Sequence, residues 1–447
     1  MLRQSLFCLL LCVLAVSARA ADPLDVYPQQ PEKLCIDKTT DEAWSLLDVM
    51  TMAICRNPSL KHRFLATRIS AAQYGQSLSN YFPTLNGAVS VTPSVQKQQS
   101  RSSRTSTDLS AQIALNLLLL DFGARGAQAA QMQAYLAAAQ STYDSSLQQL
   151  LYDVSNAYYS VLSSQENYAG LQKSEEASKK AQEEARSRFK IGLVPKSDVL
   201  QAETAYAQAR LASEVAKKNI QLKKGALAQL LSMAPDTPFT LEVPAKKIVK
   251  EKEFDDFNSV IDTAFAQRPD LQAAWQNVSA AQEAITAAQS DGLPSVSATA
   301  RAGVSDDLKS AHDTTYNAAA GLTLNVPLFT GFQHTYKVEQ AEAAYAQAQE
   351  ELERLKNTVQ KEVWDAIQNY RTFYTTHQIS KTLLRSAEES EKVAFASYKV
   401  GKINILSLLE AQTQLANARI EYNTSFYNFL ITKADVLRTL GQMEQKK

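Results

Sequence analysis

The chain has 447 residues, with 46 basic and 46 acidic side chains, so its formal net charge at pH 7 is zero. This balance provides none of the positive surface that attracts nucleic acid or an anionic membrane surface, and no nucleic-acid partner is expected. Beyond the N-terminus no stretch offers about 18 uninterrupted apolar residues, so the sequence predicts no membrane-spanning helix.

Residues 1–20 have the layout of a secretory signal peptide. Arg3 precedes an apolar run over 6–16, and a small-residue site over 18–20 follows. This order is typical of a signal that is cleaved from the mature protein, and the apolar run is too short to anchor the chain in a bilayer. We therefore expect an exported protein.

Cys35 and Cys55 are the two cysteines of the expected mature chain. In an exported protein they can form a disulfide that closes a loop at the entry to the first helix. The compartment favours this bridge over the alternative of two free buried thiols.

Residues 21–441 are expected to contain two copies of one unit. The segment at 188–210 recurs 209 residues later at 397–419, and further pairs keep nearly the same offset: Pro83 with Pro294, Gly123 with Gly331, Val154 with Val363 and Gly192 with Gly401. A period this long is too large for a solenoid repeat and indicates a duplicated structural half. We expect a first repeat over 21–233, a linker over 234–256, a second repeat over 257–441 and a tail over 442–447.

Each repeat is predicted to begin with a helix and to continue with a hairpin of two strands. In the first repeat a helical pattern over 41–79 ends before Pro83, because the residue before a proline is pushed out of the α region. The hairpin covers about 84–120, and polar and apolar residues alternate clearly over 108–117. The second repeat has its hairpin at about 295–328.

The alternation gives the strands one polar and one apolar face. The polar face is predicted to contain Ser110, Gln112, Asn116, Thr299, Arg301, Thr323 and Asn325. The other face carries leucine, valine, isoleucine and alanine, and we expect Val326 and Leu328 to belong to it.

A very long helix is predicted after each hairpin. About 70 residues rich in alanine, glutamine and glutamate follow a glycine-containing turn and end at Gly192 in one repeat and Gly401 in the other. At 1.5 Å per residue such a helix is on the order of 100 Å long. Apolar residues recur every seven positions, as at Leu136, Tyr143 and Leu150, so the helix needs coiled-coil neighbours. A second helical stretch after each glycine predicts a helical hairpin.

Four strands in one chain leave two sheet edges without partners. An unpaired edge is excluded from lipid because its backbone groups stay unsatisfied, so the strands must close into a barrel with strands of other copies. Two copies give eight strands and a filled interior, whereas three copies give twelve and leave room for a passage. The polar face would line this passage and the apolar face would contact lipid.

Four phenylalanines lie where the strands give way to the long helices: Phe82, Phe122, Phe329 and Phe332. Aromatic residues in such places are typical of the aromatic girdle of a membrane barrel and equally of ordinary packing at a junction.

Several motifs occur in the same order in both repeats. NPSL at 57–60 leads to Pro83, RPDL at 268–271 leads to Pro294, and a glycine turn and a tip motif follow in each half. This duplicated order resembles the TolC family of outer-membrane efflux and secretion ducts, from about Asp41 to Gly441. The resemblance implies a mainly α protein with a β-barrel part. It would be a homotrimer with a 12-stranded barrel in the outer membrane of a Gram-negative bacterium and a long α-helical barrel in the periplasm.

The resemblance also implies partners. Ducts of this family dock on a periplasmic adaptor protein and an inner-membrane pump of the RND, ABC or MFS type, in multidrug efflux or type I secretion. The tips are expected to contact the adaptor, through Gly192, Leu193, Val194, Gly401, Lys402 and Ile403.

Acidic residues near the tips close the periplasmic end in this family. Glu410 falls on one such position, and Ser407 falls on a second position where relatives carry an acid. Three copies of Glu410 around a threefold axis would repel one another and form a site for cations. The alternative for Glu410 is an ordinary solvated helix face.

The family also latches its tips with an ionic link. Asp198 matches the acidic side of the link, but the basic position holds Ile403, so Lys402 is the substitute partner. The alternative for Asp198 is a helix N-cap after Pro195.

No motif indicates an enzyme, a metal or a cofactor. The triplet over 121–123 matches the metal-binding triplet of kinases but lacks a glycine-rich phosphate loop, and the four histidines lack metal-ligand spacing. The alternative to a duct is a periplasmic coiled-coil adaptor or scaffold without a pore.

Overall fold

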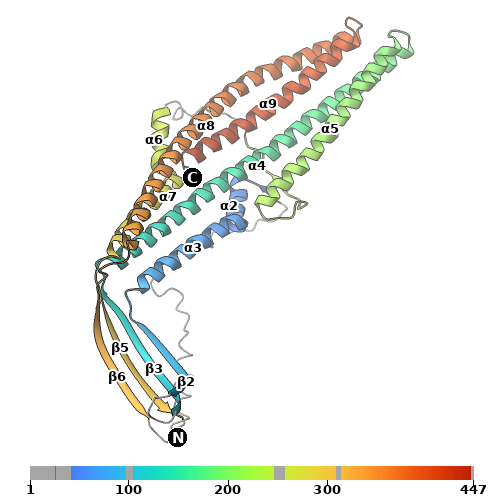
Figure 1. Ribbon diagram of the computed structural model, residues 1–447. Coiled ribbons are helices and arrows are strands. Elements are labelled where there is room, and N and C mark those ends of the chain that lie inside the picture. Colours follow the sequence, from blue (N-terminus) through green and yellow to red (C-terminus); the bar gives the residue numbers. More distant parts are fainter. Residues whose placement is uncertain (1–25, 27–41, 97–103, 246–256, 309–313, 444–447) are drawn as a thin grey trace. The chain divides into compact units, whose positions relative to one another are not determined.

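The computed structural model describes residues 26, 42–96, 104–245, 257–308 and 314–443. The predicted signal peptide, Cys35 and most of the predicted tail lie outside the described residues. What is described is mainly helical (Figure 1), with a four-stranded and a two-stranded sheet. No helix in these ranges has a stretch long and apolar enough to cross a membrane.

The helices are α2 (Leu46–Arg56), α3 (Pro58–Ser79), α4 (Ala124–Lys190), α5 (Lys196–Leu230), α6 (Phe257–Gln267), α7 (Pro269–Ser290), α8 (Gln333–Lys399) and α9 (Ile405–Thr439). The strands are β1 (Ala43–Trp44), β2 (Thr84–Gln96), β3 (Arg104–Leu120), β4 (Thr240–Leu241), β5 (Ser295–Asp307) and β6 (Thr315–Asn325).

The chain divides into two compact units, and each unit contains segments of both halves of the sequence. One unit holds the described residues of 1–30, 65–139 and 275–350, and the other holds those of 31–64, 140–274 and 351–447. The first unit contains the larger sheet, and the second contains the helical hairpins.

The sheet of the first unit has the order β2-β3-β5-β6, with antiparallel neighbours throughout. Its central pair joins the two halves of the chain, because β3 precedes the linker and β5 follows it. The register places Asn116 opposite Thr299 and Ser110 opposite Ser305. Because side chains alternate along a strand, this register determines which residues share a face.

β6 ends earlier than the hairpin expected over 295–328. It covers Thr315–Asn325. The expectation that Val326 and Leu328 belong to its apolar face is therefore wrong. Pro327 explains the end of the strand, because proline has no N–H for the sheet ladder.

The helix expected over 41–79 is two helices. α2 begins with a capping box formed by Ser45 and Asp48 and ends before Asn57. The Asn57 side chain accepts hydrogen bonds from the backbone N–H of Ser59 at 2.9 Å and of Leu60 at 3.2 Å, so it caps α3. Pro58 suits the first position of α3, whose N–H has no helical acceptor. The NPSL motif is therefore a helix start.

The segment expected to be a linker contributes to the core of the second unit. β4 lies within it and pairs in parallel with β1. Trp44 stacks on Phe239 with ring centroids 5.2 Å apart. The Tyr158 hydroxyl, from α4, donates to the Trp44 carbonyl at 3.2 Å and the Glu242 carbonyl at 2.6 Å. These bonds satisfy polar groups beside buried apolar rings, which stabilises the pairing of two very short strands.

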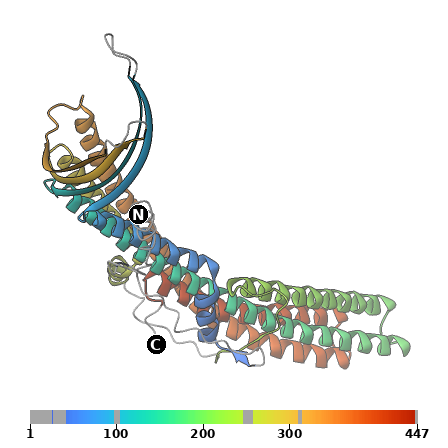
Figure 2. The same ribbon diagram turned by 90° about the horizontal axis from the view of Figure 1, so that it is seen from below.

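The two long helices end in the same kind of turn. α4 and α8 have 67 residues each, close to the predicted length. Gly192 and Gly401 adopt φ of +76° and +79°, a left-handed conformation that favours glycine. The N–H of Leu193 donates to the Arg188 carbonyl, and the Lys402 N–H donates to the Ser397 carbonyl, which is the Schellman pattern. α5 and α9 then run back along the long helices (Figure 2).

Candidate functional site

One face of the larger sheet is polar along its whole length. Asn116 pairs with Thr84 on one side and Thr299 on the other, and Ser297 pairs with Thr323. The Ser90 and Ser110 hydroxyls hydrogen-bond across β2 and β3 at 2.7 Å. By this register the seven residues of the predicted polar face share one face of the sheet: Ser110, Gln112, Asn116, Thr299, Arg301, Thr323 and Asn325.

The opposite face is apolar and exposed. Leu115 pairs with Leu85 and Ala300 on this face, and Ala298 pairs with Leu322. Leu85 is 69% exposed and Leu322 is 72% exposed. A continuous apolar sheet face is far larger than the isolated exposed side chains of a water-soluble protein, and it is typical of contact with lipid.

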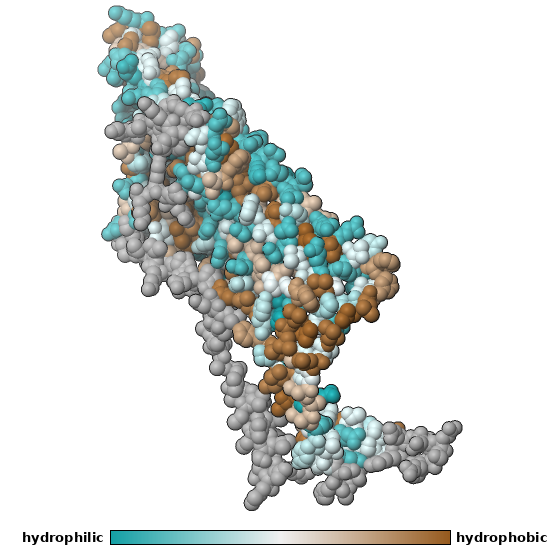
Figure 3. Space-filling model, turned by 90° about the vertical axis from the view of Figure 1, so that its left-hand side faces the viewer, coloured by the Kyte–Doolittle hydropathy of each residue, from teal (hydrophilic) through white to brown (hydrophobic). Residues whose placement is uncertain are grey.

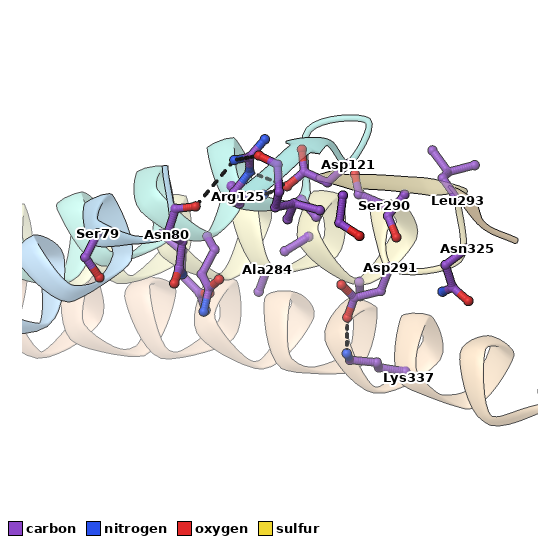
Figure 4. Close-up of a pocket in the computed structure, with 18 of the residues that line it drawn as sticks. Ser79, Asn80, Asp121, Arg125, Ala284, Ser290, Asp291, Leu293, Asn325 and Lys337 are labelled. Carbon is purple, nitrogen blue, oxygen red and sulfur yellow. Dashed lines mark hydrogen bonds and ion pairs between the residues drawn. The ribbon is translucent and has the colours of Figure 1, made fainter. Parts of the chain in front are cut away.

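The polar face continues into a hollow of about 1020 Å³ in the same unit. Thr84, Asn116, Thr299 and Asn325 from the strands line it, and polar and small side chains of the surrounding helices complete the lining: Gln128, Gln131, Ala284, Ala288, Lys337 and Gln340. The side chains drawn in Figure 4 come from these helices and strand ends. The hollow therefore joins the polar sheet face to helices of the same unit.

Two ion pairs border this hollow. The Arg125 Nε donates to Asp121 at 2.9 Å and its Nη1 donates to the Asn80 carbonyl at 3.3 Å, while Lys337 pairs with Asp291 (Figure 4). Burial alone would raise the pKa of the Asp121 carboxyl, but the hydrogen bonds and charge of Arg125 outweigh burial and hold that pKa below its usual value. Asp121 is therefore an anion at neutral pH.

The side chains of the four phenylalanines at the strand ends are exposed in the single chain. Phe329 and Phe332 contact each other edge to face, with centroids 5.5 Å apart. Phe122 and Phe332 adopt φ of +51° and +65°, a conformation that costs a side-chain-bearing residue about 1 kcal/mol or more. Figure 3 shows hydrophobic atoms gathered on the surface near this junction. The exposure of these rings fits a girdle and the Phe329–Phe332 contact fits packing at the junction, so both alternatives stay predictions.

Glu410 lies on an exposed side of α9. Its carboxylate accepts a hydrogen bond from the Gln414 amide at 3.4 Å. The Ser407 N–H and hydroxyl donate to the Asn404 side chain at 2.9 and 3.0 Å, so Ser407 belongs to the cap of α9. An exposed carboxylate fits both a gate and a solvated helix face, so the gate stays a prediction.

Asp198 is not the N-cap of α5, and that alternative is wrong. The N-cap is Pro195, and Asp198 lies in the first turn, where the helix dipole favours a carboxylate. Asp198 accepts a hydrogen bond from the Ser197 hydroxyl at 3.5 Å and, within the described residues, makes no ion pair with Lys402.

The sequence patterns did not predict the contact between Arg188 and Tyr398, which joins the two tips. Arg188, near the end of α4, donates from Nη1 to the Tyr398 carbonyl near the end of α8. One sign of this contact is present in the sequence. The two repeats differ at this position, since the first repeat has Arg188 where the second has Ser397.

Cys55, on α2, is disulfide-bonded. Its predicted partner Cys35 lies outside the described residues, so the pairing stays a prediction. Within the described residues no group of three or more His, Cys, Asp or Glu side chains could hold a metal ion.

Comparison with known proteins gives matches over nearly the whole chain. The model of the family described as outer membrane efflux protein matches residues 49–232 and again 260–442. Protein CyaE of Bordetella pertussis is 25% identical over 378 residues, which are 84% of this chain and 79% of CyaE. Outer membrane protein TolC of Salmonella enteritidis is 26% identical over 422 residues, which are 91% of this chain and 84% of TolC.

A solved structure shares the fold. The Campylobacter jejuni CmeC outer membrane channel matches with a TM-score of 0.77 and 18% identity, over 93% of this chain and 92% of CmeC. The two-faced sheet, the helical hairpins and these matches define an outer-membrane channel protein that extends into the periplasm. The chain belongs to the outer membrane efflux protein family. The resemblance to TolC is thus confirmed, and a transport channel is favoured over both an enzyme and an adaptor without a pore.

Proposed function

We propose that three copies of the chain form a duct through which an inner-membrane pump passes cargo across the periplasm and the outer membrane. The observation that carries this proposal is the sheet with one polar and one apolar face, the polar face opening into the hollow beside the helices. Three such sheets supply the twelve strands of a barrel whose lumen is polar and whose outer surface is apolar.

The free edges of the sheet support closure between copies. β2 and β6 are the outer strands, and each has a neighbour on one side only within the described residues. Their backbone groups need partners in lipid, and pairing β2 of one copy with β6 of the next supplies them. This contact joins different surfaces of identical chains, so repeated copies form a ring.

The helices of the second unit support the same ring. Leu200, Leu211, Val215 and Leu222 form an exposed apolar stripe on α5, opposite the buried Ala202, Ser213 and Ala216.

On α8, Ile379 and Leu383 border a shallow groove that also includes Tyr374 and Gln378. Within the second unit α5 packs against α9, and the apolar stripe of α5 lies on the side away from its buried residues. The α5 stripe of one copy would therefore pack on the α8 groove of the next.

The tips would meet the adaptor and carry the gate. Ile191, Leu193 and Val400 are exposed apolar side chains at the two turns, which suits a docking surface for a periplasmic adaptor. Glu410 on α9 would form an acidic ring with its two symmetry copies.

The pump would be of the RND, ABC or MFS type, and the route would serve drug efflux or type I secretion.

The first test is assembly and conductance. The protein should appear in outer-membrane extracts as a heat-modifiable trimer and should form channels in planar bilayers. A soluble periplasmic species would overturn the duct.

The second test concerns the gate. Glu410→Ala should raise single-channel conductance and weaken block by multivalent cations, because three carboxylates would leave the constriction. Glu421→Ala is the matched control, since it removes an exposed carboxylate from the same helix farther from the tip. Equal conductance of Glu410→Ala and the unmodified channel would remove Glu410 from the gate.

A further inference from the structure

Arg301, near the middle of β5, places a charge within the polar sheet face. Its cross-strand neighbours on that face are Ala114 of β3 and Ala319 of β6. The next charged residue of β5 on the same face is Asp307, six residues further along, which corresponds to about 20 Å of extended strand. Arg301 is therefore a single cation among short side chains.

The charge of Arg301 is not neutralised by the surrounding strands. The side chain is exposed, and no described residue forms an ion pair or a hydrogen bond with its guanidinium. β2 and β6 contain no charged residue, so the pairing of β2 with β6 of the next copy in the proposed ring would bring it no carboxylate. The two ion pairs that border the hollow neutralise their own charges.

Two amide side chains lie beside Arg301 on the same face. Gly303 is the next residue of β5 on this face, and a Cβ there would lie 2.9 Å from the Asn317 Oδ1 and 3.3 Å from the Gln112 Cβ. Asn317 of β6 and Gln112 of β3 therefore approach the bare backbone of the glycine from both sides. Each amide carries two N–H donors, so an unpaired guanidinium and two donor amides are neighbours on the polar face.

This combination of groups suits an oxyanion. A guanidinium is permanently charged, and its planar fork donates two parallel N–H groups to a carboxylate, phosphate or sulfate. The amides add N–H donors without adding charge. The short alanine side chains on either side of Arg301 leave room for the oxyanion to approach the fork.

We propose that the three Arg301 side chains of the trimer form a basic ring in the barrel lumen, which binds carboxylate, phosphate or sulfate groups of cargo on its way out. This inference rests on the proposed function. The threefold symmetry of the ring places the three arginines at one level of the lumen. Rings of arginine or lysine make a pore prefer anions. The barrel thus has a charged level of its own, opposite in sign to the proposed acidic ring of Glu410.

Reversal potentials of the full-length trimer in planar bilayers, measured under a KCl gradient, test the charge of the ring. Arg301→Gln should lower the ratio of chloride to potassium permeability about tenfold at about 0.01 M salt, where the Debye length is about 30 Å. At about 1 M salt the Debye length is about 3 Å, and the two channels should differ by less than about twofold. Each channel is also measured with Glu410→Ala, which removes the opposing acidic ring.

Block of the current by inorganic tripolyphosphate tests binding at the ring. Arg301→Gln should raise the half-blocking concentration about tenfold, the order expected from losing one charge-assisted hydrogen bond. Arg301→Lys keeps the charge but loses the planar fork. It should therefore keep the permeability ratio of the unmodified channel, with a half-blocking concentration between those of the unmodified channel and Arg301→Gln.

Ser297→Gln is the matched control. It adds the same side chain on the same face of β5, four residues earlier, and it keeps Arg301 in place. Its permeability ratio and half-blocking concentration should equal those of the unmodified channel. The combination of Arg301→Gln with Thr299→Arg returns a cation to the same face two residues away, and it should restore the permeability ratio.

Two results would remove the basic ring. One is an Arg301→Gln channel whose permeability ratio and tripolyphosphate block equal those of the unmodified channel. The other is an equal loss in Ser297→Gln, because the bulk of the side chain and not its charge would then control the lumen. Heat-modifiable trimer is quantified for every variant. Failure of the unmodified protein to form channels would refute the duct itself, whereas channels with an unchanged ratio would refute the ring alone.

Discussion

Arg268, the first residue of the RPDL motif, is a buried charge with a full set of partners. Its guanidinium donates to Asp270 at 2.6 and 3.0 Å and to Glu362 at 2.8 Å. Burial lowers the pKa of a guanidinium, but Asp270 and Glu362 outweigh burial and raise it. The arginine therefore stays charged and ties the start of α7 to α8. In this chain the motif has a structural role, as NPSL has at the start of α3.

The Asp121 carboxyl, at the turn between β3 and α4, predicts that the stability of the folded protein depends on pH. Its folded pKa lies below the unfolded value of about 3.9, so its stabilising contribution is complete above about pH 4 and is lost as the pH falls through the folded value. We expect Asp121→Asn to lower stability by about 1–2 kcal/mol at pH 7. The difference from the unmodified protein should shrink as the pH approaches about 3.

Thermal unfolding in detergent, followed by circular dichroism at both pH values, measures this effect. Asp291→Asn is the control, because Asp291 pairs with Lys337 on an exposed surface, where ion pairs contribute little. An Asp121→Asn difference that does not change with pH would rule out a role for the charge.

At the scale of elements, neighbouring residues of β2 should respond in opposite ways to the same substitution. Val89 lies on the apolar face and Ser90 on the polar face. Val89→Lys would place a charge in lipid, at a cost of about 2–4 kcal/mol near the bilayer centre, whereas Ser90→Lys would place it in the lumen. We expect Val89→Lys to reduce the assembled protein in the outer membrane. Ser90→Lys should assemble and shift ion selectivity toward anions. Equal assembly of the two variants would contradict the assigned faces.

Sequence patterns predicted those elements whose own periodicity is strong. The alternation over 108–117 predicted β3, and the glycines at 192 and 401 predicted the ends of α4 and α8. The pairing of β1 with β4 could not be predicted, because two residues are too short to show a period and their stability comes from Trp44 and Phe239.

The tip contact could not be predicted either, for a different reason. Arg188 and Tyr398 are 210 residues apart, and they meet only because the C-terminal ends of two long helices lie at the same place in the fold. A charged residue near the end of a helix indicates a capping role, but the sequence does not say which helix it caps.

At the scale of the whole molecule, the proposed ring predicts a seam between α5 and α8 of neighbouring copies. Leu222 is 62% exposed on the α5 stripe, and Gln221 beside it points to a different side of the helix. Leu222→Asp should destabilise the trimer by about 2–3 kcal/mol, because it removes a leucine that the seam would bury and places a carboxylate in an apolar contact. Gln221→Asp should leave the trimer intact. The temperature at which the trimer dissociates on a semi-native gel compares the two, and equal temperatures would place the seam elsewhere.

The pairing of β3 with β5 also sets the order in which the protein can fold. Thr107 and Asp307, which are hydrogen-bonded across this pair, are 200 residues apart in the chain. Closing so long a loop is slow, and it must await synthesis and export of the second half. Until then β2 and β3 form a bare hairpin whose apolar face has neither lipid nor partner strands, a state prone to aggregation. We therefore expect this hairpin to be the part of the newly exported chain that most needs protection from aggregation until both halves have arrived.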